Sequence, residues 1–118
     1  MTTVPMRPVW LVSQGRVLAS ARLAETRAQR RRGLLGHTSI DEALVLSPCT
    51  WVHTVGMKCA IDVAHVGADG IVIATTTMKP MRVGAWSPKA SFVVESAAGD
   101  FERWNLKVGD TVEVRDAE

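Results

Sequence analysis

IDVAHVGADGIVIATTTM, residues 61–78, is the part of the sequence from which the fold can be argued most directly. Ile61–Val66 and Ile71–Met78 are rich in the β-branched residues that strands favour. Between them, Ala68-Asp69-Gly70 supplies the residue types that a tight hairpin turn requires. The stretch therefore predicts two neighbouring antiparallel strands.

Further strands are predicted on both sides of this hairpin, because short apolar or β-branched runs are bounded there by turn residues. They are Val9–Val12, Arg16–Leu23, Ala43–Ser47, Trp51–Val55, Ser91–Ala97 and Thr111–Arg115. With the hairpin, the sequence thus predicts seven or eight short strands. This content indicates a mainly β fold, either a compact antiparallel β-sandwich or a squashed barrel, with one short helix.

The short helix is predicted over Arg27–Leu35. Thr26-Arg27-Ala28-Gln29 has the capping-box pattern, in which the Thr26 hydroxyl and the Gln29 amide satisfy backbone donors at the helix start. Gly36 has the residue type that commonly follows a helix end. A single additional helical turn is compatible with Asp100–Trp104.

The length of 118 residues predicts one domain, which we expect to span residues 9–118 after a flexible arm at residues 1–8. Apolar residues make up 47% and charged residues 22% of the chain, which is typical of a globular protein and not of a disordered one. The longest early apolar run, Val9–Val12, is too short for a signal-peptide core or a membrane span. We therefore expect a cytoplasmic monomer with no membrane partner.

The charge of the chain gives little support to nucleic-acid binding. The net charge is only +2, too small for a strong phosphate-binding footprint. Arg27, Arg30 and Arg31 share one face of the predicted helix, and Arg32 lies beside them. This face either binds phosphate or is simply solvated. We favour the solvated surface and expect no nucleic-acid partner, because no aromatic-rich RNA-binding motif or helix-turn-helix accompanies the arginines.

Cys49, His53 and Met57 are spaced four residues apart, and soft sulfur with imidazole suggests a copper or zinc site. On the predicted strand Trp51–Val55, however, successive members would lie about 13 Å apart at ~3.3 Å per residue. We therefore expect no metal and no cofactor, and keep the metal site as an alternative. The spacing of Cys49 and Cys59 matches no zinc motif, so we expect two free thiols, with a reversible disulfide as the alternative.

Two carboxylates fall inside predicted strands, at Asp62 and Glu95. Glu95 alternates with Val93 and Ala97 and is therefore expected to face an apolar side. A carboxylate there needs a cationic or backbone donor as partner. The candidates are Lys58, Arg82 and His53. The pattern indicates an exposed sheet carboxylate, a structural ion pair, or a polar pocket whose carboxylates and cation orient a ligand.

Several short motifs occur in an order that resembles the family known as domain of unknown function 192. They are Arg32-Gly33-Leu34-Leu35-Gly36, Gly56-Met57-Lys58, Ile61-Asp62-Val63, Asp69-Gly70, Pro80, Val94-Glu95, Ala98-Gly99 and Val108-Gly109-Asp110. Pro48-Cys49 and His53-Thr54 look like the actinobacterial branch of that family. The resemblance covers Ala21 to Val114 and implies a mostly β, sandwich-like domain without an established activity.

The chain departs from the pattern of that family at three positions. Cys59 stands where the family usually has Asn, Ala60 where it has Pro, and Gly56 where it has an aromatic residue. Met57, Lys58, Asp62 and Glu95 match the family pattern.

We expect a non-catalytic binding or accessory module for an unknown small ligand or partner protein. Its ligand-binding residues are predicted to be His53, Met57, Lys58, Asp62, Arg82 and Glu95. An alternative is an enzyme that uses Glu95 or His53 as general acid or base, which requires both side chains at one pocket. A second alternative is the metal site at Cys49, His53 and Met57. Trp86 would anchor a partner if exposed, but we expect it to be buried as a cap on the core.

Overall fold

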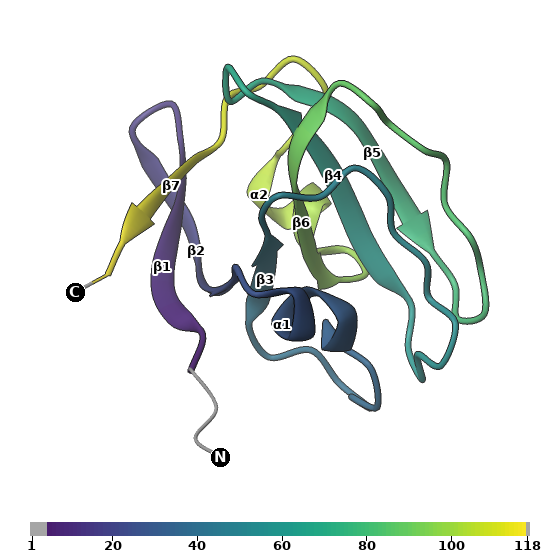
Figure 1. Ribbon diagram of the computed structural model, residues 1–118. Coiled ribbons are helices and arrows are strands. Elements are labelled where there is room, and N and C mark those ends of the chain that lie inside the picture. The colour runs from purple at the N-terminus through teal and green to yellow at the C-terminus, as the bar shows by residue number, and fades with distance from the viewer. Residues whose placement is uncertain (1–4, 118) are drawn as a thin grey trace.

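The computed structural model describes residues 5–117 and consists of one mixed seven-stranded sheet with two short helices (Figure 1). The elements are β1 (Arg7–Ser13), β2 (Arg16–Ala24), α1 (Arg27–Arg32), β3 (Ala43–Leu46), β4 (Ile61–Gly67), β5 (Val72–Met78), β6 (Ala90–Ala97), α2 (Asp100–Trp104) and β7 (Glu113–Asp116). The strand order is β5-β4-β6-β3-β2-β1-β7. The mainly β fold and the hairpin at residues 61–78 are thereby confirmed.

The chain before β7 joins the two ends of the sheet. Ile71, at the start of the β5 side, forms a β-bridge with Thr111. The N–H of Val72 donates to the carbonyl of Asp110 at 2.8 Å, and the N–H of Val112 donates to that of Gly70 at 2.7 Å. The sheet is thus closed in the manner of a squashed barrel, as expected. One strand pair differs from the antiparallel expectation, because β2 and β3 are parallel.

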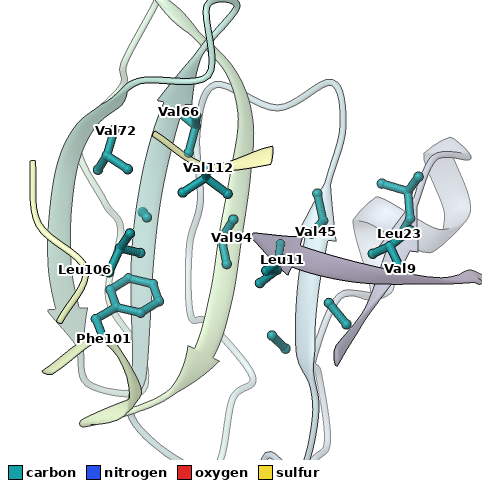
Figure 2. Close-up of a cluster of buried hydrophobic side chains, with 13 residues drawn as sticks. Val9, Leu11, Leu23, Val45, Val66, Val72, Val94, Phe101, Leu106 and Val112 are labelled. Carbon is teal, nitrogen blue, oxygen red and sulfur yellow. The ribbon is translucent and has the colours of Figure 1, made fainter. Parts of the chain in front are cut away.

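The inner face of the curved sheet surrounds the larger hydrophobic cluster (Figure 2). Side chains alternate along each strand, so Val45 of β3, Val66 of β4 and Val94 of β6 all point inward. Phe101 of α2 and Leu106 close this cluster from the side of the C-terminal segment. The interior of the barrel is therefore filled with side chains.

The outer face of the same central strands carries a second hydrophobic cluster. It contains the alternate residues of β3, β4 and β6: Leu44, Leu46, Ile61, Val63 and Val93. Chain outside the regular strands covers them, through Leu34, Val52 and Met57. Because both faces are buried, all residues of β3 and β4 are buried, including Asp62 and His65 of β4.

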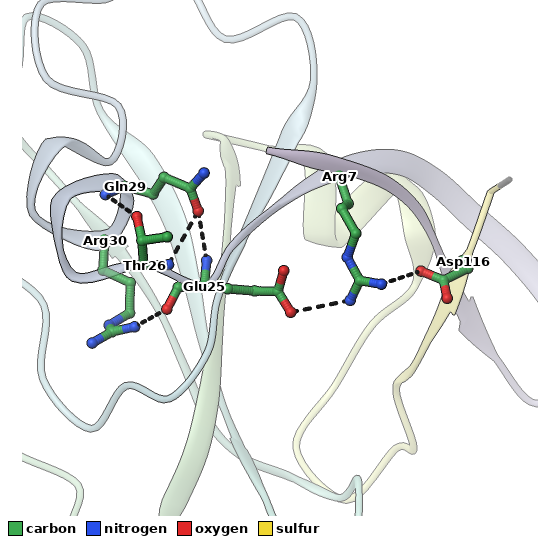
Figure 3. Close-up of polar contacts among 6 residues, drawn as sticks. All are labelled: Arg7, Glu25, Thr26, Gln29, Arg30 and Asp116. Atoms are coloured by element: carbon green, nitrogen blue, oxygen red, sulfur yellow. Dashed lines mark hydrogen bonds and ion pairs between the residues drawn. The ribbon is translucent and has the colours of Figure 1, made fainter. Parts of the chain in front are cut away.

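The predicted capping box of α1 is confirmed (Figure 3). The Thr26 hydroxyl accepts from the N–H of Gln29, and the Gln29 side chain accepts from the N–H of Thr26, both at 3.1 Å. The helix ends at Arg32, earlier than the expected Leu35, because Gly33 leaves helical geometry with φ +47° and ψ −128°. A glycine accepts this backbone conformation without strain.

The N-terminal segment joins the sheet earlier than the expected arm would allow. β1 begins at Arg7, so Arg7 and Pro8 already belong to the sheet. Arg7 pairs with Glu25 at 3.0 Å and with Asp116 at 3.3 Å (Figure 3). The rest of the expected arm includes residues 1–4, which lie outside the described residues.

Asp62 of β4 fixes α2 against the barrel. Its Oδ2 accepts from the N–H groups of Gly99 at 3.0 Å and Phe101 at 3.1 Å, at the start of α2. Its Oδ1 accepts from the Thr77 hydroxyl at 2.7 Å. The side chain is buried, and its hydrogen-bonding capacity is directed at backbone and hydroxyl donors. These contacts assign Asp62 to the architecture of the fold.

Replacing Asp62 with Ala would leave the N–H groups of Gly99 and Phe101 without their acceptor. Each buried unsatisfied donor costs about 1–3 kcal/mol, so we expect D62A to lower the free energy of unfolding by roughly 2–4 kcal/mol. Urea unfolding measures this loss. The exposed Asp41→Ala is the control and is expected to change stability by less than about 0.5 kcal/mol. Equal stability of the two variants would contradict the structural role of Asp62.

Candidate functional site

The segment that follows β3 does not form the expected strand at Trp51–Val55. Only His53 makes a β-bridge there, with Val83. The N–H of Thr54 donates to the carbonyl of Arg82 at 2.7 Å, and that of Gly84 donates to the carbonyl of Val52 at 2.9 Å. Residues 50–54 and 82–87 therefore support each other across the outer face of the sheet.

The side chain of Thr54 holds these two segments together. It is fully buried, and its hydroxyl donates to the carbonyl of Lys79 at 2.6 Å. The same oxygen accepts from the N–H of Arg82 at 2.9 Å. A hydroxyl can satisfy backbone groups that no ladder partner reaches, which explains why this β-favouring sequence folds as irregular chain.

A cavity of about 310 Å³ lies between this irregular chain, α1 and the sheet. We call it the arginine hollow. It is lined by Arg27, Arg30, Arg31, Arg32, Gly33, Leu34, Leu35, Leu46, Cys49, Trp51, Val52, His53, Met57 and Glu95. The walls are mainly apolar, the cations come from α1, and the one carboxylate comes from β6.

Glu95 is the unusual member of this set. It stands in register between Leu44 of β3 and Val63 of β4, on the apolar outer face, and only 5% of the residue is exposed. Within residues 5–117, no side chain or backbone group forms a hydrogen bond or ion pair with its carboxylate. Burial raises its pKa from 4.5 to about 7. The expectation that Glu95 faces an apolar side is confirmed, but the partner expected among Lys58, Arg82 and His53 does not bind it.

Gly33 brings the chain close over the Glu95 carboxylate. A Cβ atom at Gly33 would lie 3.9 Å from Oε1 of Glu95. Its backbone conformation, φ +47° with ψ −128°, is one that side-chain-bearing residues avoid. This turn lets the chain leave α1 and place Leu34 in the second hydrophobic cluster, on the outer face of the sheet.

The arginines of α1 line the hollow while remaining accessible to solvent. The Arg30 guanidinium donates to the carbonyl of Glu25 (Figure 3). Arg27, Arg31 and Arg32 form no side-chain hydrogen bond or ion pair with any residue in the described part of the chain. The sequence favours a solvated surface for this face and contains no local pattern that connects it with Glu95. The available signal was Gly33, directly after the arginines, which redirects the chain toward the sheet.

The six residues predicted to bind a ligand do not form one groove. His53, Met57 and Glu95 line the arginine hollow. Asp62 lies below α2 and serves the fold. Arg82 lines a different hollow, and Lys58 is exposed and lines neither. Asp62 is separated from the hollow because side chains alternate along β4, so that Ile61 and Val63 face outward and Asp62 faces the other way.

Cys49, His53 and Met57 do line one cavity, because the chain that carries them is not extended. Each of the first two already has a local contact: the Cys49 thiol donates to the carbonyl of Trp51 at 3.3 Å, and Nδ1 of His53 accepts from the N–H of Val55 at 3.3 Å. No group of three or more His, Cys, Asp or Glu side chains in residues 5–117 could hold a metal ion. Burial raises the pKa of the Cys49 thiol, and the nearby Glu95 carboxylate raises it further. Both cysteines are free.

A second hollow of about 600 Å³ lies between the β4–β5 hairpin and residues 79–87. His65 lines it, and Nε2 of this buried histidine has no hydrogen-bond partner among residues 5–117. Burial lowers the pKa of His65. Trp86 also lines this hollow and is 68% exposed, so the interpretation that it caps the core is wrong.

Comparison with known proteins identifies the family. The family model for domain of unknown function 192 (DUF192), described as an uncharacterized ACR, matches residues 9–114. The chain belongs to the DUF192 family. The resemblance of the ordered motifs is thereby confirmed, whereas placement in an actinobacterial branch stays a prediction. No curated protein matches the sequence.

Two crystal structures share the fold of this DUF192 protein. A protein of unknown function from Novosphingobium aromaticivorans DSM 12444 is 23% identical, with a TM-score of 0.72 over 90% of this chain and 83% of that one. A putative transcription regulator from Sinorhizobium meliloti 1021 is 20% identical, with a TM-score of 0.77 over 96% of this chain and 98% of that one. At these identities the comparison supports the fold alone. Within residues 5–117, no helix is long and apolar enough to cross a membrane.

The raised pKa of Glu95 predicts a specific pH dependence of stability. Since the folded protein binds this proton more tightly than the unfolded chain, the stability contribution is complete below pH 4.5 and is lost as pH rises through about 7. Over pH 5 to 8 the loss amounts to roughly 2.5 kcal/mol. The side chain introduced in E95Q cannot ionise, so this variant should not lose that stability. Its free energy of unfolding relative to that of the native DUF192 protein should therefore rise by the same amount between pH 5 and pH 8.

Urea unfolding at pH 5 and pH 8 measures this difference, because contributions from all other groups cancel between the two proteins. The exposed Glu102→Gln serves as the matched control and should follow the native protein at both pH values. An E95Q curve parallel to that of the native protein would contradict a protonated, buried Glu95.

Proposed function

We propose that this DUF192 protein is a small-molecule binding module and that the arginine hollow is its site. The observation that carries the proposal is the carboxylate of Glu95, which is buried, faces a cavity and lacks a partner among residues 5–117. A buried polar group without a partner is costly, so the fold alone gives no reason for it. A bound molecule that hydrogen-bonds the carboxyl group would supply the missing partner.

The size and lining of the hollow support a small ligand. Its volume of about 310 Å³ lies at the lower end of the range typical of ligand sites. Leu34, Leu46 and Val52 supply apolar walls, and Glu95 and the arginines supply the few polar groups that orient a ligand. Such a combination is the usual composition of a specific small-molecule site.

A fragment screen by ¹H–¹⁵N NMR tests this function. We expect weak binders that shift the backbone amides of Gly33 and Val52, and we expect Glu95→Gln to change their affinity at least about threefold at pH 7. Glu102→Gln keeps the same composition change away from the hollow and should leave the affinities unchanged. If no fragment of a chemically diverse set shifts these amides, the proposed function is wrong.

A general acid–base enzyme is the second candidate. His53 and Glu95 line the same cavity, and a carboxyl group with a pKa of about 7 is well suited to proton transfer near neutral pH. The two functions separate under turnover conditions. A binding module returns each hollow-binding fragment chemically unchanged after prolonged incubation, whereas an enzyme converts one of them, with a rate that disappears in E95Q.

The proposal takes the protein to act as a cytoplasmic monomer without a nucleic-acid partner. The small net charge of +2 supports the last point, because a strong phosphate-binding footprint would require a larger excess of cations. Sedimentation equilibrium of the purified protein decides the oligomeric state.

A further inference from the structure

The mouth of the arginine hollow carries a concentration of positive charge. Four guanidinium groups line it, and those of Arg27, Arg31 and Arg32 bind no residue within 5–117. Guanidinium groups form strong charge-assisted hydrogen bonds with carboxylates and phosphates, often with two parallel N–H···O contacts. The charge and donor geometry of the mouth therefore favour an anionic group and disfavour a free cation.

The floor of the hollow has a different chemistry. Glu95 stands between Leu44 and Val63, and these neighbours disfavour a charged carboxylate. A neutral carboxyl group has one O–H to donate. Its natural counterpart is an uncharged acceptor such as a carbonyl oxygen.

The mouth and the floor are separate sites within one cavity. The arginines of the mouth are exposed or half-buried on α1, whereas Glu95 lies on the sheet and is only 5% exposed. Cys49 lines the same cavity as both groups. The ligand has to span the distance between mouth and floor along the apolar walls formed by Leu46 and Val52.

We propose that the ligand is a small organic anion whose anionic group binds the arginines and whose other end presents a carbonyl oxygen to Glu95. This inference rests on the proposed function and names the ligand class of the same hollow. The two ends are joined by a short apolar body, because the walls between mouth and floor offer side chains such as Leu34 and Met57. A zwitterion is the competing class, since an ammonium group would pair with an ionised Glu95.

Four six-carbon probes separate these classes: adipic acid monoamide, hexanoate, hexanamide and 6-aminohexanoate. NMR titration at pH 6.5 is expected to rank adipic acid monoamide first, because it alone has both the anion and the carbonyl acceptor. Hexanoate and hexanamide each lack one end and should bind at least about tenfold more weakly, in line with the strength of a charge-assisted contact. The zwitterion 6-aminohexanoate should bind more weakly than the monoamide.

Matched variants assign the two ends. Arg27→Gln with Arg31→Gln removes two charges at the mouth and should weaken the monoamide about tenfold while leaving hexanamide unchanged. The control is Arg22→Gln with Arg115→Gln, which lowers the net charge equally on β2 and β7 and should change neither probe. Urea unfolding confirms that each variant is folded before it is titrated.

The pH dependence identifies the proton on Glu95. Binding of the monoamide should weaken as pH rises from 6 to 8, and Glu95→Gln should abolish this dependence because its amide remains a donor at every pH. Strengthening with pH, or first rank for 6-aminohexanoate, would overturn the inference in favour of a zwitterion. First rank for hexanamide, or failure of all four probes to bind, would also overturn it. The proposed function would survive these results if the fragment screen still located another binder in the hollow.

Discussion

The burial of both faces of the central strands is the constraint on which the rest of the structure depends. β3, β4 and β6 carry apolar residues at successive positions, so one set faces the barrel interior and the other faces outward. The outward set would be exposed on a simple barrel. Chain outside the regular strands has to cover it, and residues 33–35 and 48–57 provide much of that cover.

Irregular chain covers a sheet less completely than a second sheet would, because it has no repeating register to match the strands. The arginine hollow is one place where the cover is incomplete. Glu95 occupies that place in the middle of the apolar face, where a leucine would avoid the desolvation of a carboxylate. A buried carboxylate that costs stability and forms no hydrogen bond or ion pair within residues 5–117 is characteristic of a site kept for binding or chemistry.

The sequence predicts those parts of the fold that depend on local residue choice. The Ala68-Asp69-Gly70 turn, the capping box at Thr26 and the alternation that places Glu95 on an apolar side are all local patterns, and the structure confirms them. The Trp51–Val55 strand fails for a non-local reason. Its backbone groups form hydrogen bonds with residues 82–87, about thirty positions along the chain. The buried Thr54 hydroxyl adds a further hydrogen bond, which it accepts from the N–H of Arg82. No local pattern encodes that pairing. The prediction that Arg82 lies in one groove with Glu95 is wrong for the same reason, because Arg82 lines the other hollow.

Only part of the site can be predicted from the sequence, because its residues come from distant parts of the chain. Glu95 stands out in the sequence as a carboxylate inside an apolar run, but its cationic neighbours lie on α1, more than sixty residues away. The arginine face is solvated, as the sequence suggested, and yet it also borders the hollow, because Gly33 turns the chain toward the sheet directly after the last arginine. The arginines of α1 are therefore both surface residues and residues that line the hollow. The same exposure leaves Arg27, Arg31 and Arg32 without a side-chain hydrogen bond or ion pair among residues 5–117, and the proposal that they bind an anion depends on this.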